Sequence, residues 1–214
     1  MVRVYITNVE NLPDPMETPQ IMQGFSDERK EKALKFKQVK DRKESLGAGL
    51  LLLKVLKMQG KSMEDIYYGE NGKPELDGLH FNLSHSHNMV ALAVSEQPVG
   101  IDLEIIDKIH GNIAKRYFTE RENAYLDAFE GAEREREFFR IWTMKESYLK
   151  MTGEGLSMEL NRVDFVIGDK VTVYRGEDCC ECFVKEYEVP GYKLTMCAEE
   201  EDVAEVLKYV DILE

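Results

Sequence analysis

Several features are scarce in this chain of 214 residues, and each scarcity excludes a class of protein. Basic residues are outnumbered by acidic ones, 28 to 41, so the formal net charge is −13. Nucleic-acid binders normally carry a basic patch or a basic balance, so we expect no nucleic-acid partner. No apolar run approaches the roughly 20 residues that span a bilayer, so we expect no membrane residence. The segment 1–13 alternates like a strand and lacks the apolar core of a signal peptide, which favours a cytoplasmic protein.

Cysteine is also scarce, with four in the chain. Three of them form one cluster, Cys179, Cys180 and Cys182, and the fourth is Cys197. Structural zinc sites favour a gap of about two to four residues within each ligand pair, and this cluster does not follow that spacing. No partner histidine follows it either. We therefore expect free thiols in a reduced compartment rather than a metal site.

Both halves of the chain show helical patterns followed by short alternating strands. Helical spacing of apolar residues predicts helices at about 26–36, 41–58, 112–117, 120–129 and 133–151. Alternation predicts strands at 2–9 and in HFNLSHS, MVALAVS, VGIDLEI, VDFVIG, VTVYRG, ECFVKEYEV and YKLTMCA. We therefore predict an α+β fold with two similar lobes, 1–100 and 101–214, each a small, mostly antiparallel sheet packed with helices.

Two motifs place acidic side chains close together. In the strand VGIDLE, Asp102 and Glu104 project from the same face because side chains alternate with period two. In the helix WTMKESYLK, Glu146 and Lys150 are four residues apart and so share a face. Three carboxylates and a lysine suit a hard cation bound to a phosphate, because Mg²⁺ prefers oxygen ligands. The same residues also fit a solvated strand edge and a surface ion pair.

Five motifs in order give the chain a resemblance to a known family. They are GKP at 72–74, FNLSHS at 81–86, VGIDLE at 99–104, YFTERE at 117–122 and FFRIWTMKESYLKMTGEGLS at 138–157. With this ordered set the chain resembles the 4'-phosphopantetheinyl transferases of the Sfp type. The resemblance implies a two-lobed pseudo-dimeric fold with pseudo-twofold symmetry. It also implies transfer of the phosphopantetheine arm of coenzyme A to a serine of an apo acyl or peptidyl carrier protein, with release of adenosine 3',5'-bisphosphate.

The resemblance implies roles at the reacting end of coenzyme A. Asp102, Glu104 and Glu146 would bind Mg²⁺ at the pyrophosphate, and Lys150 would contact the same pyrophosphate. Glu122 matches the acidic residue after the family's FT motif and is the expected base for the carrier serine. A carboxylate is a weak base at neutral pH, so its surroundings would have to help it.

The resemblance also implies contacts to the 3'-phosphate of coenzyme A. Lys73, Ser84 and His85 match the family's positions in GKP and NLSHS. The segment 26–36 resembles the family's basic helix near the nucleotide, with Arg29 and Lys32 in corresponding places. At a position where the family often has an arginine that contacts the nucleotide, an ungapped match falls on Glu44. The ordinary alternatives are a solvated turn lysine, an interior histidine and a solvated helix face.

Two other functions are compatible with parts of the pattern. A metal-dependent phosphodiesterase or nuclease also uses carboxylates and a lysine, but it needs a basic track that this acidic chain lacks. A non-catalytic binding module would leave the acids as a solvated rim. For the transferase, the partners are coenzyme A and an apo carrier protein, with an apolar patch within 111–129 as the docking surface, and we expect a monomer.

Overall fold

The computed structural model describes residues 1–69, 72–154 and 160–213. The last three residues of the motif at 138–157 lie outside the described residues. The α-helices are α1 (Asp27–Leu34), α2 (Val39–Met58), α3 (Ile113–Tyr117), α4 (Glu120–Leu126) and α5 (Gly131–Thr152). Short 3-10 helices lie at Pro19–Met22, Met63–Asp65 and Leu160–Arg162. No helix among the described residues is both long and apolar enough to cross a membrane.

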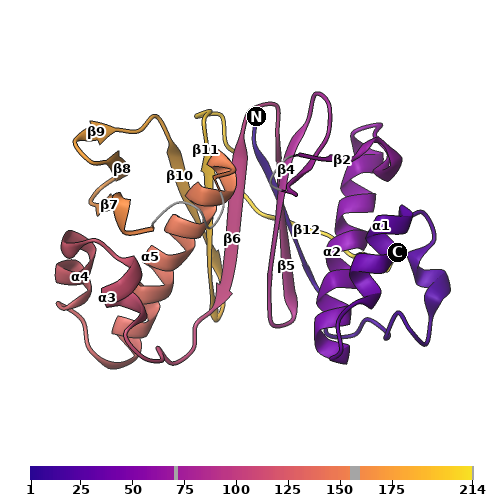
Figure 1. The fold of residues 1–214 in the computed structure, drawn as a ribbon, viewed down its shortest axis with the longest axis horizontal. Coiled ribbons are helices and arrows are strands. Elements are labelled where there is room, and N and C mark those ends of the chain that lie inside the picture. The colour runs from indigo at the N-terminus through magenta and orange to yellow at the C-terminus, as the bar shows by residue number, and fades with distance from the viewer. Residues whose placement is uncertain (70–71, 155–159, 214) are drawn as a thin grey trace.

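Two main sheets and two small ones contain the strands (Figure 1). The first main sheet has the order β12-β1-β5-β4, with β12 (Lys208–Tyr209), β1 (Arg3–Asn8), β5 (Met89–Ser95) and β4 (His80–Ser86). The second has the order β10-β11-β6, with β10 (Phe183–Val189), β11 (Tyr192–Ala198) and β6 (Val99–Ile105). The small sheets join β2 (Tyr67–Tyr68) to β3 (Pro74–Glu75), and β7 (Val163–Ile167) to β8 (Val171–Arg175) and β9 (Asp178–Cys179).

The two halves repeat one plan. Each begins with a strand, continues through helices to one long helix, and ends with an antiparallel hairpin of its main sheet. The order β1-β5-β4 in the first sheet therefore corresponds to β6-β11-β10 in the second. This arrangement confirms the predicted α+β fold with two similar lobes. The boundary predicted at residue 100 falls inside β6, so we propose to assign that strand whole to the second lobe.

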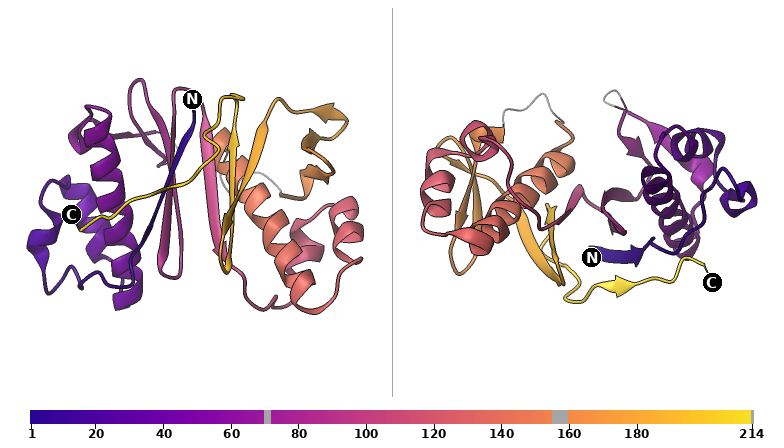
Figure 2. Two further views of the ribbon diagram at one scale, coloured as in Figure 1. Left: turned by 180° about the vertical axis from the view of Figure 1, so that it is seen from behind. Right: turned by 90° about the horizontal axis from the view of Figure 1, so that it is seen from below.

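The lobes pack as four layers, with a helix on each outer side and the two sheets between them (Figure 1). Helix α2 and the first sheet enclose one apolar cluster, which includes Leu51, Leu92 and Val94. The central cluster lies between the sheets and includes Ile6, Ile101 and Met196. In Figure 2, the view from below shows the helices of the two lobes standing apart, with the strands of the two sheets between them. The two sheets thus form the floor between the two long helices.

The two sheets meet along the edges of β4 and β6, and side chains make the connection. Three backbone N–H groups of β6 donate to side-chain oxygens of β4. The pairs are Ile101 to Asn82 Oδ1 (2.9 Å), Leu103 to Ser84 Oγ (3.1 Å) and Ile105 to Ser86 Oγ (3.1 Å). Because Asn82, Ser84 and Ser86 alternate along β4, they lie on one face and match the repeat of β6. We call this row of contacts the seam.

The end of the chain returns to the first lobe. After β11 the chain crosses back, Val203 forms a parallel bridge with Val2, and β12 pairs in parallel with β1. Only two residues form β12, which carries no alternation long enough to be predicted from sequence. The first main sheet is therefore built from both ends of the chain.

Candidate active site

Strand β6 presents its two acids on the face opposite the central core. Ile101 and Leu103 are fully buried between the sheets. Asp102 and Glu104 instead line a cavity of about 310 Å³, which we call the carboxylate cavity. Asp102 is 3% exposed, so its charge is almost fully withdrawn from water. The period-two alternation expected from the sequence thus places both acids in one site.

Helix α5 reaches these acids because Gly100 has no side chain. A Cβ at Gly100 would overlap the backbone carbonyl oxygen of Ser147 and the backbone nitrogen of Met151. The backbone of the helix therefore touches the strand, and Glu146 and Lys150 reach the same cavity as the strand acids. Trp142, one turn before Glu146, forms part of the cavity wall.

Lys150 is held at the centre of this cluster. Its Nζ donates to Asp102 Oδ1 (2.6 Å), to Ser84 Oγ (3.1 Å) and to the Ile101 carbonyl oxygen (3.2 Å). The second carboxylate oxygen, Asp102 Oδ2, is buried and has no hydrogen-bond partner in the described structure. A buried carboxylate oxygen without a donor is costly, which makes this atom suited to a further cation or donor.

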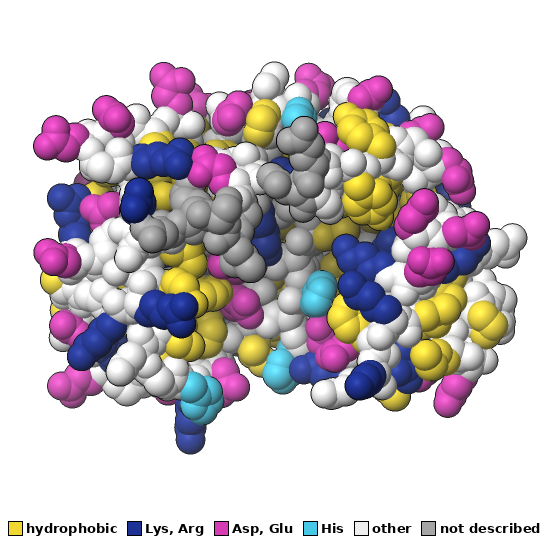
Figure 3. Space-filling view, in the orientation of Figure 1, with side chains coloured by type: hydrophobic (Ala, Val, Ile, Leu, Met, Phe, Trp, Pro, Cys, Tyr) yellow, Lys and Arg dark blue, Asp and Glu magenta, His cyan; other side chains and the backbone are white. Residues whose placement is uncertain are grey.

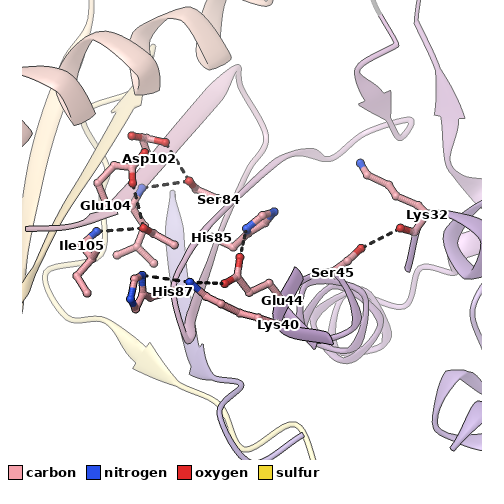
Figure 4. A network of polar contacts seen from close by, with 12 residues as sticks. Lys32, Lys40, Glu44, Ser45, Ser84, His85, His87, Asp102, Glu104 and Ile105 are labelled. Atoms are coloured by element: carbon pink, nitrogen blue, oxygen red, sulfur yellow. Dashed lines mark hydrogen bonds and ion pairs between the residues drawn. The ribbon is translucent and has the colours of Figure 1, made fainter. Parts of the chain in front are cut away.

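Two serines of the seam orient the strand acids (Figure 4). Ser84 Oγ donates to Asp102 Oδ1 (2.9 Å), and Ser86 Oγ donates to Glu104 Oε2 (3.0 Å). Each serine therefore accepts a hydrogen bond from a backbone N–H of β6 and donates one to a carboxylate of β6. The seam fixes the side-chain positions of both acids.

The electrostatics of the cavity disfavour three ionised carboxylates. Burial raises the pKa of Glu104 to about 7, with repulsion from Asp102 and Glu146 adding to it and Ser86 and Lys150 opposing it. Burial also raises the pKa of Glu146, followed by repulsion from Asp102. One lysine does not compensate three acids, so a bound cation would relieve the repulsion.

A second cavity, of about 140 Å³, lies in the first lobe, and we call it the cation cavity. Its lining includes Arg29, Lys32 and Ser45, and His85 lines both this cavity and the carboxylate cavity. Burial lowers the pKa of Arg29 to about 10, and its Nε is buried without a partner in the described residues. Burial, followed by repulsion from Arg29, lowers the pKa of Lys32. No acid pairs with either cation among the described residues, so the cavity suits an anion.

The cations and acids occupy opposite sides of one hollow. Figure 3 shows dark blue side chains gathered on the side of the central hollow that belongs to the first lobe, and acidic and apolar side chains on the other side. A ligand that carries phosphates at two separate points would meet a cationic wall at one end and the carboxylates at the other.

Comparison with known proteins now decides the family. The 4'-phosphopantetheinyl transferase Sfp of Bacillus subtilis (strain 168) is 34% identical over 203 residues, which cover 91% of this chain and 91% of that protein. The chain belongs to the 4'-phosphopantetheinyl transferase superfamily. The sequence profile of that superfamily matches residues 98–197, the part that contains β6 and α5.

Two further matches complete the comparison. The 4'-phosphopantetheinyl transferase gsp of Aneurinibacillus migulanus is 32% identical to this transferase and covers 92% of this chain and 86% of its own. The holo-[acyl-carrier-protein] synthase (AcpS) structure of Thermotoga maritima aligns with a TM-score of 0.41 at 19% identity, over 47% of this chain and 61% of that chain. The predicted family and the predicted enzyme class are confirmed by the relatives that span most of the chain.

The structure places Glu122 outside the transferase's carboxylate cavity. Its side chain is fully buried, with Oε2 paired to Lys145 Nζ (2.7 Å) and receiving the Thr119 N–H (2.8 Å). Its other oxygen, Oε1, receives the Phe165 N–H (2.9 Å). Burial raises the pKa of Glu122, and Lys145 opposes the shift. Both oxygens of Glu122 are therefore engaged in the interior of the second lobe.

The residues expected at the 3'-phosphate are brought together only in part. Arg29, Lys32 and His85 line the cation cavity, whereas the hydroxyl of Ser84 is held by the carboxylate cluster. Ser84 and His85 are consecutive in β4, so their side chains point to opposite faces. Lys73 lies elsewhere: its Nζ donates to the Lys150 carbonyl oxygen (2.8 Å) near the end of α5, and burial lowers its pKa.

Sequence reasoning missed two residues of the site. Ser86 has the same role toward Glu104 that Ser84 has toward Asp102, and the period-two spacing within FNLSHS could have identified it. In the sequence, Glu44 stands out only because the family often has an arginine at the matching position. In the structure it is a buried acid in contact with His85. Its position depends on how α2 packs against β4, which no local pattern reveals.

Proposed function

We propose that this protein transfers the 4'-phosphopantetheine arm of coenzyme A to a serine hydroxyl of an apo acyl or peptidyl carrier protein, in a Mg²⁺-dependent reaction that releases adenosine 3',5'-bisphosphate. The observation that carries the proposal is the meeting of Asp102, Glu104, Glu146 and Lys150 in one cavity that adjoins the cation cavity through His85. The spacing of acids and cations suits a co-substrate with a pyrophosphate and a separate 3'-phosphate.

The carboxylate cavity fits Mg²⁺ in donor type. Asp102, Glu104 and Glu146 offer only oxygen ligands, and Asp102 Oδ2 is a buried acceptor without a donor. Among the described residues, no three acidic, histidine or cysteine side chains are already closed around one point as a metal site. We therefore propose that these three acids hold the ion together with the pyrophosphate. When bound, Mg²⁺ would neutralise charge on the pyrophosphate.

The side chains of the cavity supply the remaining steps. Lys150 lies beside Asp102 and would offset negative charge on the departing phosphate. Ser84 and Ser86 keep the strand acids in place, so little reorganisation is needed during transfer. Burial raises the pKa of Glu104 and of Glu146 in the absence of the ion, and a bound ion would hold both carboxylates ionised.

We propose a positioning role for Glu122 in place of the expected base role. Its capping contact to Thr119 begins α4, and its ion pair with Lys145 ties that helix to α5. It therefore supports the helix that carries Glu146 and Lys150 without contacting the substrate. Arg29, Lys32 and His85 are proposed to bind the 3'-phosphate, with Lys73 at the other rim of the hollow.

The carrier is proposed to dock beside α3 and α4. Within the expected range 111–129, Phe118 and Leu126 are buried in the core, whereas Ile113 and Ala114 are half-buried. Ala114 lines a surface cavity of about 480 Å³ together with Lys115 and Arg134, which would suit an acidic partner with an apolar segment. Activity as a monomer in the cytoplasm, without nucleic acid or membrane, remains our expectation.

A mass assay tests the proposal directly. The protein is incubated with coenzyme A, Mg²⁺ and apo carriers from fatty acid, polyketide and nonribosomal peptide systems, and each carrier is weighed by mass spectrometry. We expect one carrier at least to gain one phosphopantetheine arm, and a chelator or the change Glu146→Ala to abolish the gain. Glu177→Ala, an exposed acid in the turn between β8 and β9, is the matched control and should retain activity. The proposal fails if no carrier gains mass, and cutting of DNA or RNA would then favour the nuclease alternative.

A further inference from the structure

One buried acid has no part in the proposed transfer. The side chain of Glu44 on α2 is 9% exposed, and its Oε2 lies 3.0 Å from His85 Nδ1. Its other oxygen, Oε1, is buried and has no hydrogen-bond partner in the described structure. The nearest cation is Lys40, one turn earlier, whose Nζ is 3.8 Å from Oε1. Glu44 therefore receives one close contact, from an imidazole.

This contact fixes the histidine ring. An ionised carboxylate can only accept, so the hydrogen shared with Glu44 belongs to His85 Nδ1. Figure 4 shows the His85 ring with one nitrogen turned toward Glu44 of α2. The second nitrogen, Nε2, lies on the other side of the ring, away from Glu44. Because His85 is 44% exposed and lines both cavities, that nitrogen is open to a ligand.

A second pair of residues steadies the arrangement. Lys40 Nζ lies 3.4 Å from Nδ1 of His87, the residue that follows the end of β4. Figure 4 shows the chain of contacts from His87 through Lys40 and Glu44 to His85. Two points of the β4–β5 hairpin are thus connected to one turn of α2. Carboxylates behind histidines orient the ring for its ligand in the same way at metal and catalytic sites.

The cost of burial argues that Glu44 does more than fill space. Placing a carboxylate in the interior is costly unless it is well paired, and here one oxygen lacks a donor. Without the imidazole between them, the negative charge would also repel an anion in the cation cavity. The position is tolerable for anion binding only while His85 stands between Glu44 and the ligand.

We propose that Glu44 is a positioning residue that holds His85 as a donor to the 3'-phosphate of the nucleotide and so sets the preference for coenzyme A over 3'-dephospho-coenzyme A. The inference rests on the proposed function, because that function places the 3'-phosphate in the cation cavity with Arg29 and Lys32. It goes further by assigning the selectivity to an acid that contacts no substrate.

Equilibrium binding measures this preference without any transfer step. Calorimetric titrations with coenzyme A and with 3'-dephospho-coenzyme A are made on the unaltered protein and on the Glu44→Ala, Glu44→Gln and Glu31→Ala variants. Glu44→Ala should weaken coenzyme A binding about tenfold and leave 3'-dephospho-coenzyme A within about twofold. Glu44→Gln keeps an acceptor for Nδ1 and should retain most of the preference. Glu31→Ala removes an equal charge from an exposed position on α1 and should change neither affinity.

A spectroscopic readout follows the ring itself. The chain has four histidines, so the imidazole nitrogen signals in a ¹⁵N NMR spectrum can be assigned by single substitutions. We expect His85 to carry its hydrogen on Nδ1 in the unaltered protein and to lose that fixed state in Glu44→Ala. A hydrogen found on Nε2 alone in the unaltered protein would overturn the inference.

The outcomes separate the two proposals. Equal weakening of both ligands by Glu44→Ala, or no preference for coenzyme A in the unaltered protein, overturns the inference about Glu44. If the preference exists and is lost in Glu44→Ala while no carrier is ever modified, the transferase proposal fails and the positioning role stands. Retained binding of 3'-dephospho-coenzyme A shows that the altered protein is folded.

Discussion

The two lobes follow one plan, yet their long helices meet their sheets differently. In the second lobe the glycine lies on the strand: Gly100 lets the backbone of α5 touch β6. In the first lobe the glycines lie on the helix, where a Cβ at Gly47 would overlap Val9 and one at Gly49 would overlap Phe25. Loop residues therefore close on α2, and a cavity remains between α2 and β4.

The difference shows how one scaffold provides two kinds of site. Where the helix touches the strand, acids from both elements share a small cavity with Lys150. Where the helix stands off, the buried Arg29 and the exposed Lys32 line a cavity that is free for an anion. Three measurements test this difference between the lobes.

The largest effect is expected from the buried ion pair of the second lobe. Glu122→Ala leaves the Lys145 ammonium fully buried without its acid and should lower the free energy of unfolding by about 3–5 kcal/mol. Urea denaturation measures this loss. The double change to Glu122→Leu and Lys145→Met should restore much of the stability, because no charge is then left unpaired. A Glu122→Ala protein of unaltered stability that has lost transfer would instead support the base role.

The next effect tests the close approach of α5. Gly100→Ala places a methyl group against two backbone atoms of the helix and should cost about 3 kcal/mol, measured by the same denaturation. The helix must also move away from β6, so turnover should fall even where the protein is folded. Gly168→Ala, at an exposed position with room for a Cβ, is the matched control. Equal stability of the two variants would show that α5 does not need this contact.

The smallest effect concerns the pH dependence of the metal-free protein. The pKa of Glu104 is raised by folding from an ordinary value of 4.5 to about 7, so the folded state binds more protons between these values than the unfolded state. Stability should therefore fall as pH rises through this window, by about 2 kcal/mol after allowance for solvent screening. Denaturation with a chelator present measures the slope, and Glu104→Gln should remove most of it. Stability that rises over the same window would contradict the assigned electrostatics.

Alternation and turn signals made much of the fold predictable. The strands β4, β5, β6 and β11 have the bounds that the sequence predicts, because each is a short run bounded by turn-forming residues. The helices also match to within a few residues, and α1 begins directly after its N-cap, Ser26. The pairing of β12 with β1 could not be predicted, since it depends on a contact between distant parts of the chain.

The site was predictable where one element determines the geometry. Asp102 with Glu104, and Glu146 with Lys150, share faces by the period of a strand and of a helix. The role of Glu122 depends on Lys145 of a different helix, although the capping spacing from Thr119 to Glu122 was already a structural signal. Glu44 and its contact with His85 depend on tertiary packing alone.

The seam between β4 and β6 limits how the lobes can move. Its contacts repeat at every second residue of both strands, so a slip by one residue would turn Leu83 and His85 toward β6 and break all three N–H contacts at once. Sliding of β4 along β6 is therefore blocked. The two lobes are thus held in one register, which keeps the acids of β6 at a fixed height relative to His85 of β4 and to the cations beside it.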